Sequence, residues 1–180
     1  MNKLLILTIV LLAMNCKTPD ARKPVSVKTG SFIDASVERN KRLNAQEQAS
    51  IEKIIQEQGN NYIASKSGFW YYYNNKIEAD TLKTPLFGDI INYNYNVKAL
   101  NGVLIYSKEV IKTQTYAMDK EELFTGLREG LKLMKIGETV TFIFPSQKAY
   151  GYYGDENKID RNTPIICEVT VNSITQNQTN

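Results

Sequence analysis

Residues 119–144 read DKEELFTGLREGLKLMKIGETVTFIF, and two hydrophobic periods follow one another in this stretch. The first part has apolar residues at helical spacing, at Leu123, Phe124, Leu127, Leu131 and Met134. A capping-box pattern at Asp119 opens this helix and Gly137 ends it. The second part alternates at Val140, Phe142 and Phe144, as a strand does. The stretch predicts a short helix followed directly by a strand.

The same period-two pattern recurs on both sides of this stretch. Residues 91–97 alternate large apolar residues with asparagine, and residues 165–171 alternate Ile165, Cys167, Val169 and Val171 with other side chains. A turn is expected at Asn101-Gly102, and residues 103–118 are mixed and extended. These elements predict an α+β domain, in which one short helix lies across an antiparallel sheet.

A second helix is expected near the N-terminus. Asn44 and Glu47 have the spacing of a capping box, apolar residues then recur at helical spacing, and Gly59 supplies a stop, so the helix should cover about residues 45–58. Its apolar stripe indicates a face that packs on the domain. A surface for a partner or a second copy is the alternative.

An aromatic run, Phe69-Trp70-Tyr71-Tyr72-Tyr73, precedes a predicted turn at Asn74-Asn75-Lys76. Large aromatic residues in strands mostly form core and cross-strand contacts. A platform that stacks sugars or bases is the alternative interpretation.

The first residues have the pattern of an export signal. Lys3 precedes an apolar run that is too short to span a bilayer and that ends near Cys16, as in a bacterial lipobox. We therefore expect residues 1–15 to be a lipoprotein signal peptide, Cys16 to be lipidated, and the protein to be anchored to the membrane of the cell envelope, facing the periplasm or the surface. A plain signal peptide with an incidental cysteine is the alternative.

Composition excludes several classes of function. The net charge of +3 comes from interspersed charges, so a nucleic acid is not expected as a partner. The chain has no histidine and two cysteines, which leaves no usual zinc site and no histidine-dependent hydrolase triad. No metal or cofactor is expected. With Cys16 lipidated, Cys167 should be a free, buried thiol.

The order of motifs over residues 88–174 resembles the FKBP family of peptidyl-prolyl cis-trans isomerases. In chain order the matching segments are Gly88-Asp89 with the strand to Tyr95, Leu100-Asn101-Gly102, the helix segment 124–138, FPSQKAYG at 144–151 and IDRNTPI at 159–165. The resemblance implies a bent antiparallel sheet wrapped around a short α-helix, with an N-terminal helical extension.

Domain limits follow from this resemblance and from composition. We expect the lipidated Cys16 to begin a flexible tether over residues 16–43, followed by the N-terminal amphipathic helix in 44–65. The isomerase domain should occupy residues 66–175 and a polar tail residues 176–180.

The resemblance also implies a site. Tyr95 and Tyr150 match the family's catalytic tyrosines. The substrate-binding positions match apolar residues, namely Leu123, Phe124, Ile159, Leu127 and Ile105. The implied clients are polypeptides with X-Pro bonds.

Three positions depart from the family pattern. Tyr106 stands where the family usually has an acid, Leu127 where it commonly has tryptophan, and Cys167 where it has phenylalanine. By this comparison, restoring an acid at position 106 and tryptophan at 127 is expected to raise activity. Two functions follow: an isomerase and folding helper of the envelope, or an FKBP-fold binding module of an envelope or motility complex that grips proline turns without effective turnover.

Overall fold

The computed structural model describes residues 29–79 and 81–177. The chain divides into two units, Met1–Glu38 and Arg39–Asn180, and the fold below is that of the second. The predicted signal peptide, the lipidation site at Cys16, the tether as far as residue 28 and the tail from residue 178 lie outside the described residues.

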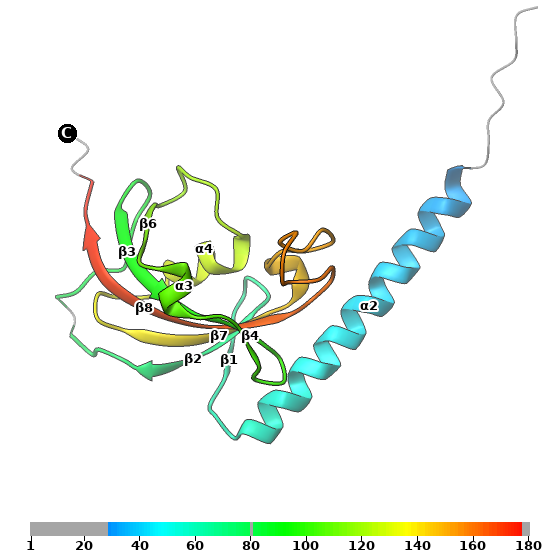
Figure 1. The fold of residues 1–180 in the computed structure, drawn as a ribbon, viewed down its shortest axis with the longest axis horizontal. Helices are drawn as coiled ribbons and strands as arrows, with labels where there is room; N and C mark the ends of the chain where they lie inside the picture. Colours follow the sequence, from blue (N-terminus) through cyan, green and yellow to red (C-terminus); the bar gives the residue numbers. More distant parts are fainter. Residues whose placement is uncertain (1–28, 80, 178–180) are drawn as a thin grey trace, which may run out of the picture. The chain divides into compact units, whose positions relative to one another are not determined.

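The described part of the second unit contains an eight-stranded antiparallel sheet. Its strands are β1 (Ile63–Ala64), β2 (Trp70–Asn75), β3 (Ile90–Tyr95), β4 (Val97–Ala99), β5 (Leu104–Tyr106), β6 (Gln114–Ala117), β7 (Thr139–Phe144) and β8 (Ile165–Thr175). The main order is β1-β2-β7-β8-β3-β6, and β4 joins β5 to β8. The long β8 curves through the centre of the sheet (Figure 1). The predicted α+β class with a bent antiparallel sheet is confirmed.

Helix α4 (Thr125–Leu131) lies on the concave side of the sheet (Figure 1). Two glycines allow the close approach: a Cβ on Gly126 would lie 2.5 Å from the Phe144 ring, and one on Gly130 would lie 2.9 Å from the Phe142 ring. The two phenylalanine rings stack with their centroids 5.3 Å apart. The glycines therefore fix the distance between α4 and β7.

The start of this helix differs from the prediction. Asp119 has φ 58°, which a right-handed helix does not allow. The Glu121 carboxylate accepts a hydrogen bond from the Ala117 backbone N–H at 3.0 Å, so it closes a turn and caps no helix. The helix also ends at Leu131, well before Gly137, although the apolar stripe continues to the fully buried Met134.

Helix α2 (Thr29–Gln58) begins much earlier than predicted. The expected tether over residues 16–43 is therefore wrong for 29–43. Beyond Gly30 this segment has no glycine or proline, and its charged and straight-chain residues favour a helix. Asn44 lies inside the helix and is not its cap. The predicted end is confirmed, since Gly59 follows with φ 65°, and β1 replaces helix within the predicted range 44–65.

The part of α2 that belongs to the second unit packs on the sheet. Ile51 is fully buried in a small apolar cluster with Ile143 of β7 and Ile166 of β8. Nearby, the Glu47 carboxylate accepts hydrogen bonds from the Ser146 N–H at 2.9 Å and from the Ser146 hydroxyl at 2.7 Å. The apolar stripe is thus a packing face, as predicted.

Two further expectations concern single segments. Tyr71 and Tyr73 of β2 pack against the main core, which supports the core interpretation of the aromatic run, and β2 continues through Asn75, where a turn was predicted. Cys167 is fully buried and in no disulfide within the described residues, as predicted. The tail is partly held, because the Asn177 N–H donates to the Asp89 carboxylate at 2.8 Å.

A short helix, α3 (Lys108–Ile111), connects β5 to β6 where an extended segment was expected. The Ser107 hydroxyl caps it by accepting from the Val110 N–H, at 3.4 Å.

Candidate active site

Tyr95 ends β3 and is half-buried, with its ring packed against the main core. It pairs with Val169 of β8, and its ring lies 5.7 Å from that of the buried Tyr93. The two tyrosines are two residues apart in one strand, so both face the concave side. Tyr93 is buried there, while Tyr95 at the strand end borders an opening.

Leu123 and Phe124 enter the site from the loop before α4. Phe124 is the N-cap of this helix, and its carbonyl accepts the Arg128 N–H at 3.1 Å. The Phe124 ring lies 5.5 Å from the Phe144 ring, nearly at right angles, and 5.3 Å from the Tyr150 ring. These ring contacts fix the start of α4 beside β7 and Tyr150.

Tyr150 follows the 3₁₀ helix η1 (Ser146–Lys148). The carbonyl of the buried Ser146 accepts the N–H groups of Ala149 at 3.0 Å and Gly151 at 2.8 Å, one on each side of Tyr150. The Gly151 carbonyl in turn accepts the Asn162 N–H at 2.9 Å. The backbone around Tyr150 is thereby fixed, and its side chain points into the site.

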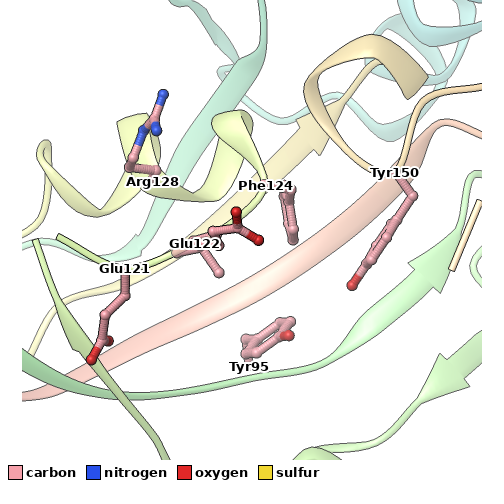
Figure 2. A pocket seen from close by; sticks show the side chains of 7 residues that line it. Tyr95, Glu121, Glu122, Phe124, Arg128 and Tyr150 are labelled. Carbon is pink, nitrogen blue, oxygen red and sulfur yellow. The ribbon is translucent and has the colours of Figure 1, made fainter. Parts of the chain in front are cut away.

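These side chains line an open pocket of about 560 Å³, a volume within the usual range for small-ligand sites. Four predicted residues line it, namely Tyr95, Leu123, Phe124 and Tyr150. Figure 2 shows the two tyrosine hydroxyls directed toward each other below the Phe124 ring. The structure therefore brings together two phenols and an apolar wall from three separate segments.

Both phenols keep their protons at neutral pH. Burial, assisted by the nearby Cys167, raises the pKa of Tyr95 to about 12. Burial, followed by the neighbouring Tyr95 hydroxyl, also raises the pKa of Tyr150 above its ordinary value. The site can therefore donate hydrogen bonds from neutral hydroxyls to a carbonyl oxygen.

The remaining predicted residues support the pocket and do not line it. Leu127 on α4 is fully buried and Ile159 is 3% exposed, both within the main core. Ile105 is half-buried against the same core. Their positions as substrate contacts stay predictions.

Three charged residues of the pocket were missed from the sequence: Glu121, Glu122 and Arg128. The two glutamates were assigned to a helix cap, but the later start of α4 leaves them exposed on the loop at the pocket rim. Arg128 lies 3.7 Å from both Asp119 and Glu129. The charge pattern directly before the apolar pair Leu123-Phe124 was the signal that could have identified the two glutamates, whereas no local pattern marks Arg128 on α4.

None of the helices in residues 29–79 and 81–177 has the length and the apolar composition that a membrane span requires. No group of three or more acidic, cysteine or histidine side chains in the same residues is placed to hold a metal ion.

A concave sheet that holds a short helix and an open, tyrosine-lined pocket defines the class of fold and site seen in prolyl isomerases. Residues 83–172 match the family model of the FKBP-type peptidyl-prolyl cis-trans isomerases, which is half of the chain. The chain belongs to this family.

Relatives and solved structures agree with this assignment. The chain is 26% identical over 163 residues to a probable FKBP-type peptidyl-prolyl cis-trans isomerase of Haemophilus influenzae, covering 84% of this chain and 65% of that protein, so it spans just under two thirds of that relative's length. It is 28% identical over 83 residues to human peptidyl-prolyl cis-trans isomerase FKBP9, covering 46% of this chain and 15% of that protein.

Among solved structures, the crystal structure of FkpA from Escherichia coli matches with a TM-score of 0.60 at 21% identity, over 98% of this chain and 83% of that one. A peptidyl-prolyl cis-trans isomerase from Pseudomonas syringae matches with the same TM-score at 19% identity, over 76% of this chain and 96% of that chain. These two structures support the fold.

Proposed function

We propose that this protein is a peptidyl-prolyl cis-trans isomerase that acts on X-Pro bonds of polypeptide clients. The observation that carries the proposal is the meeting of Tyr95, Phe124 and Tyr150 around one open pocket, from three segments that the family pattern also uses. The chemistry needs no nucleophile, metal or cofactor, since only rotation about the amide bond is required.

The barrier to this rotation is about 20 kcal/mol, because the twisted amide loses its resonance. An apolar wall that receives the prolyl ring withdraws water and favours the less polar twisted amide. A phenol that donates to a flanking carbonyl holds the peptide during rotation. Leu123 and Phe124 supply the wall, and Tyr150 supplies the donor.

The site is tested by Tyr150→Phe, which removes the hydroxyl and keeps the ring. A hydrogen bond of this kind contributes on the order of 1 kcal/mol, so kcat/KM on an X-Pro peptide should fall by roughly several-fold to tenfold. The matched control is Tyr153→Phe, since Tyr153 is 76% exposed on the same loop. Equal activity of the two variants would contradict the assigned role of Tyr150.

A binding module without effective turnover is the second candidate. The side chain at position 106 favours it, because a tyrosine stands where the family usually has an acid. In that case the folded wild-type protein should bind proline-containing peptides, for example in a fluorescence titration, and should show no isomerisation above the uncatalysed rate.

The cellular setting is a further part of the proposal. We infer from residues 1–16 that the protein is exported and lipid-anchored to the envelope, facing the periplasm or the surface, where it assists the folding of clients. A lipidation signal, an N-terminal helix and an FKBP-type domain together resemble the gliding-motility-associated lipoprotein GldI. The proposed function therefore includes a role in gliding motility.

The anchor is tested by growing producing cells with labelled fatty acid. The mature protein should carry the label and begin at Cys16, and Cys16→Ser should abolish the label. An unlabelled product cut at another position would contradict the anchor and leave the isomerase proposal untouched.

A further inference from the structure

The turn that follows Tyr150 is organised by one carboxylate. Oδ1 of Asp155 accepts the backbone N–H groups of Ile159 at 2.7 Å and Asn157 at 3.0 Å. The Asp155 N–H donates in return to the Ile159 carbonyl at 3.1 Å. Asp155 therefore holds Ile159, the predicted apolar wall, through both its side chain and its backbone.

Gly154 leaves this turn little freedom. It has φ +71°, and a Cβ there would lie 2.2 Å from the Ile159 carbonyl oxygen. Ile159 itself is 3% exposed within the main core. The turn is thus closed tightly, and its geometry fixes the position of a side chain in the main core.

The second carboxylate oxygen of Asp155 binds a different element. The Tyr106 hydroxyl, at the end of β5, donates a hydrogen bond to Oδ2. Tyr106 is fixed in turn by the pairing of its backbone with Val97 of β4, and Lys158 lies 5.3 Å above its ring. The hydrogen bond therefore ties the turn to the sheet.

At neutral pH Tyr106 is protonated and Asp155 is ionised. The hydrogen bond to Asp155 raises the pKa of Tyr106. Partial burial would raise the pKa of Asp155, but the hydrogen bonds from Tyr106 and the backbone N–H groups outweigh burial and lower it. The pair is a neutral phenol that donates to a carboxylate, the stronger type of hydrogen bond.

The pair also lies close to the site. The Asp155 charge is one of the groups that raise the pKa of Tyr150. Position 106, moreover, is the one where the family usually has an acid. In this chain the acid is carried by residue 155 instead, and a tyrosine reaches it from β5.

We propose that Asp155, oriented by the Tyr106 hydroxyl, is a positioning residue of this site. It holds Ile159 and the loop behind Tyr150 in the arrangement that receives a prolyl ring. The proposal rests on the isomerase function stated above, and it assigns to this chain a hydrogen-bonded pair in place of the family's single acid.

The test compares Asp155→Ala, Asp155→Asn and Tyr106→Phe in the full chain. Asp155→Ala removes the side-chain hydrogen bonds to the turn amides and to Tyr106. We therefore expect kcat/KM on an X-Pro peptide to fall about tenfold, and amide exchange at Ile159 and Asn157 to accelerate. Asp155→Asn keeps an oxygen for the two amides and should recover most of the activity. Tyr106→Phe should cost several-fold, and its combination with Asp155→Ala should be no worse than Asp155→Ala alone.

Glu156→Gln serves as the matched control, because Glu156 is an exposed neighbouring carboxylate, and it should match wild type. Multiplying effects in the double variant, or Asp155→Ala within twofold of wild type with unchanged exchange, would overturn the proposal. A wild-type protein without activity would instead refute the isomerase function, and the exchange measurement would still report whether Asp155 closes the turn.

Discussion

The family resemblance and the structure lead to opposite expectations for an acid at position 106. By resemblance, an acid at this position should improve the site. In the structure, Tyr106 donates to Asp155, so an aspartate there would remove this donor and, with its shorter side chain, would leave a second negative charge facing the Asp155 carboxylate. The second position that departs from the family pattern, Leu127, is fully buried, so tryptophan there would overpack the core beneath the pocket.

We therefore predict that Tyr106→Asp lowers the free energy of unfolding at neutral pH by about 1 kcal/mol, a size typical of partly exposed charge pairs. Like charges raise the pKa of the pair in the folded state, so the loss is full above that pKa and disappears as pH falls through it toward the unfolded value, about 4. Lys158 is the nearby cation that reduces the effect.

The control for this prediction is the double variant Tyr106→Asp/Asp155→Asn, which keeps one charge. Urea unfolding at several pH values should show the two variants converging below about pH 5 and separating toward pH 7. A gap that is independent of pH would mean that steric misfit, and not charge, causes the loss.

At the residue scale, the spacing of sequence motifs predicted residues that line the pocket, but it did not predict the hydrogen bond between Asp155 and Tyr106. Tyr95, Leu123, Phe124 and Tyr150 belong to motifs with fixed positions in the sequence. Asp155 and Tyr106 are separated by 49 positions, and no local pattern joins them. Pairs of this kind depend on how a loop returns to the sheet, which no periodicity encodes.

At the scale of elements, α2 is joined to the segment that carries Tyr150. Glu47 satisfies both the N–H and the hydroxyl of Ser146, which is 1% exposed. Ser146 begins η1, directly before Ala149 and Tyr150. The sequence assigned Glu47 to a capping box, because the motif is local, whereas its partner lies 99 positions away.

Glu47→Ala should lower the free energy of unfolding by roughly 1–3 kcal/mol, because it leaves two buried donors of Ser146 without their acceptor. Glu57→Ala is the control, since its exposed carboxylate lies 3.8 Å from Lys53 on the same helix and satisfies no buried donor within residues 29–79 and 81–177. Urea unfolding with unchanged m-values would measure the difference. Equal losses in the two variants would contradict the role of Glu47.

The periodicities predicted β3 and the middle of β8 well, since buried and less buried residues alternate there. In β7 both faces are buried, because Ile143 packs in one cluster with Ile51 of α2. Helix limits were less predictable. Asp119 and Glu121 have the sequence pattern of a helix cap but form a turn, and Asn44 has the same pattern inside a continuous helix. A capping motif shows that a helix could begin at a residue, but tertiary contacts decide whether it does.

At the scale of the molecule, the predicted isomerase domain of residues 66–175 is not the whole folding unit. Ile143 and Ile166 lie in one cluster with Ile51 of α2, with Trp70 packed beside it. Removing α2 would open this face of the sheet to water, at a cost of about 25 cal/mol per Å² of apolar surface.

A chain that begins at residue 66 should therefore unfold at a lower urea concentration than one that begins at residue 39, and it should bind a hydrophobic dye such as ANS. The longer chain, which keeps Glu47 and Ile51, is the control and should match the full protein. If the two chains were equally stable, α2 would be an appendage and not part of the core.

The central place of β8 has a consequence for biosynthesis. The ribosome makes the chain from its N-terminus, so β8 emerges after all seven other strands of the described sheet. Until residues 165–175 are released, β7 and β3 have no strand between them, and each presents an unpaired edge to other nascent chains. The sheet then closes in one late step made of contacts that are distant in sequence, which is slow compared with helix formation. Until that step, this member of a prolyl isomerase family is synthesised with the middle strand of its sheet missing.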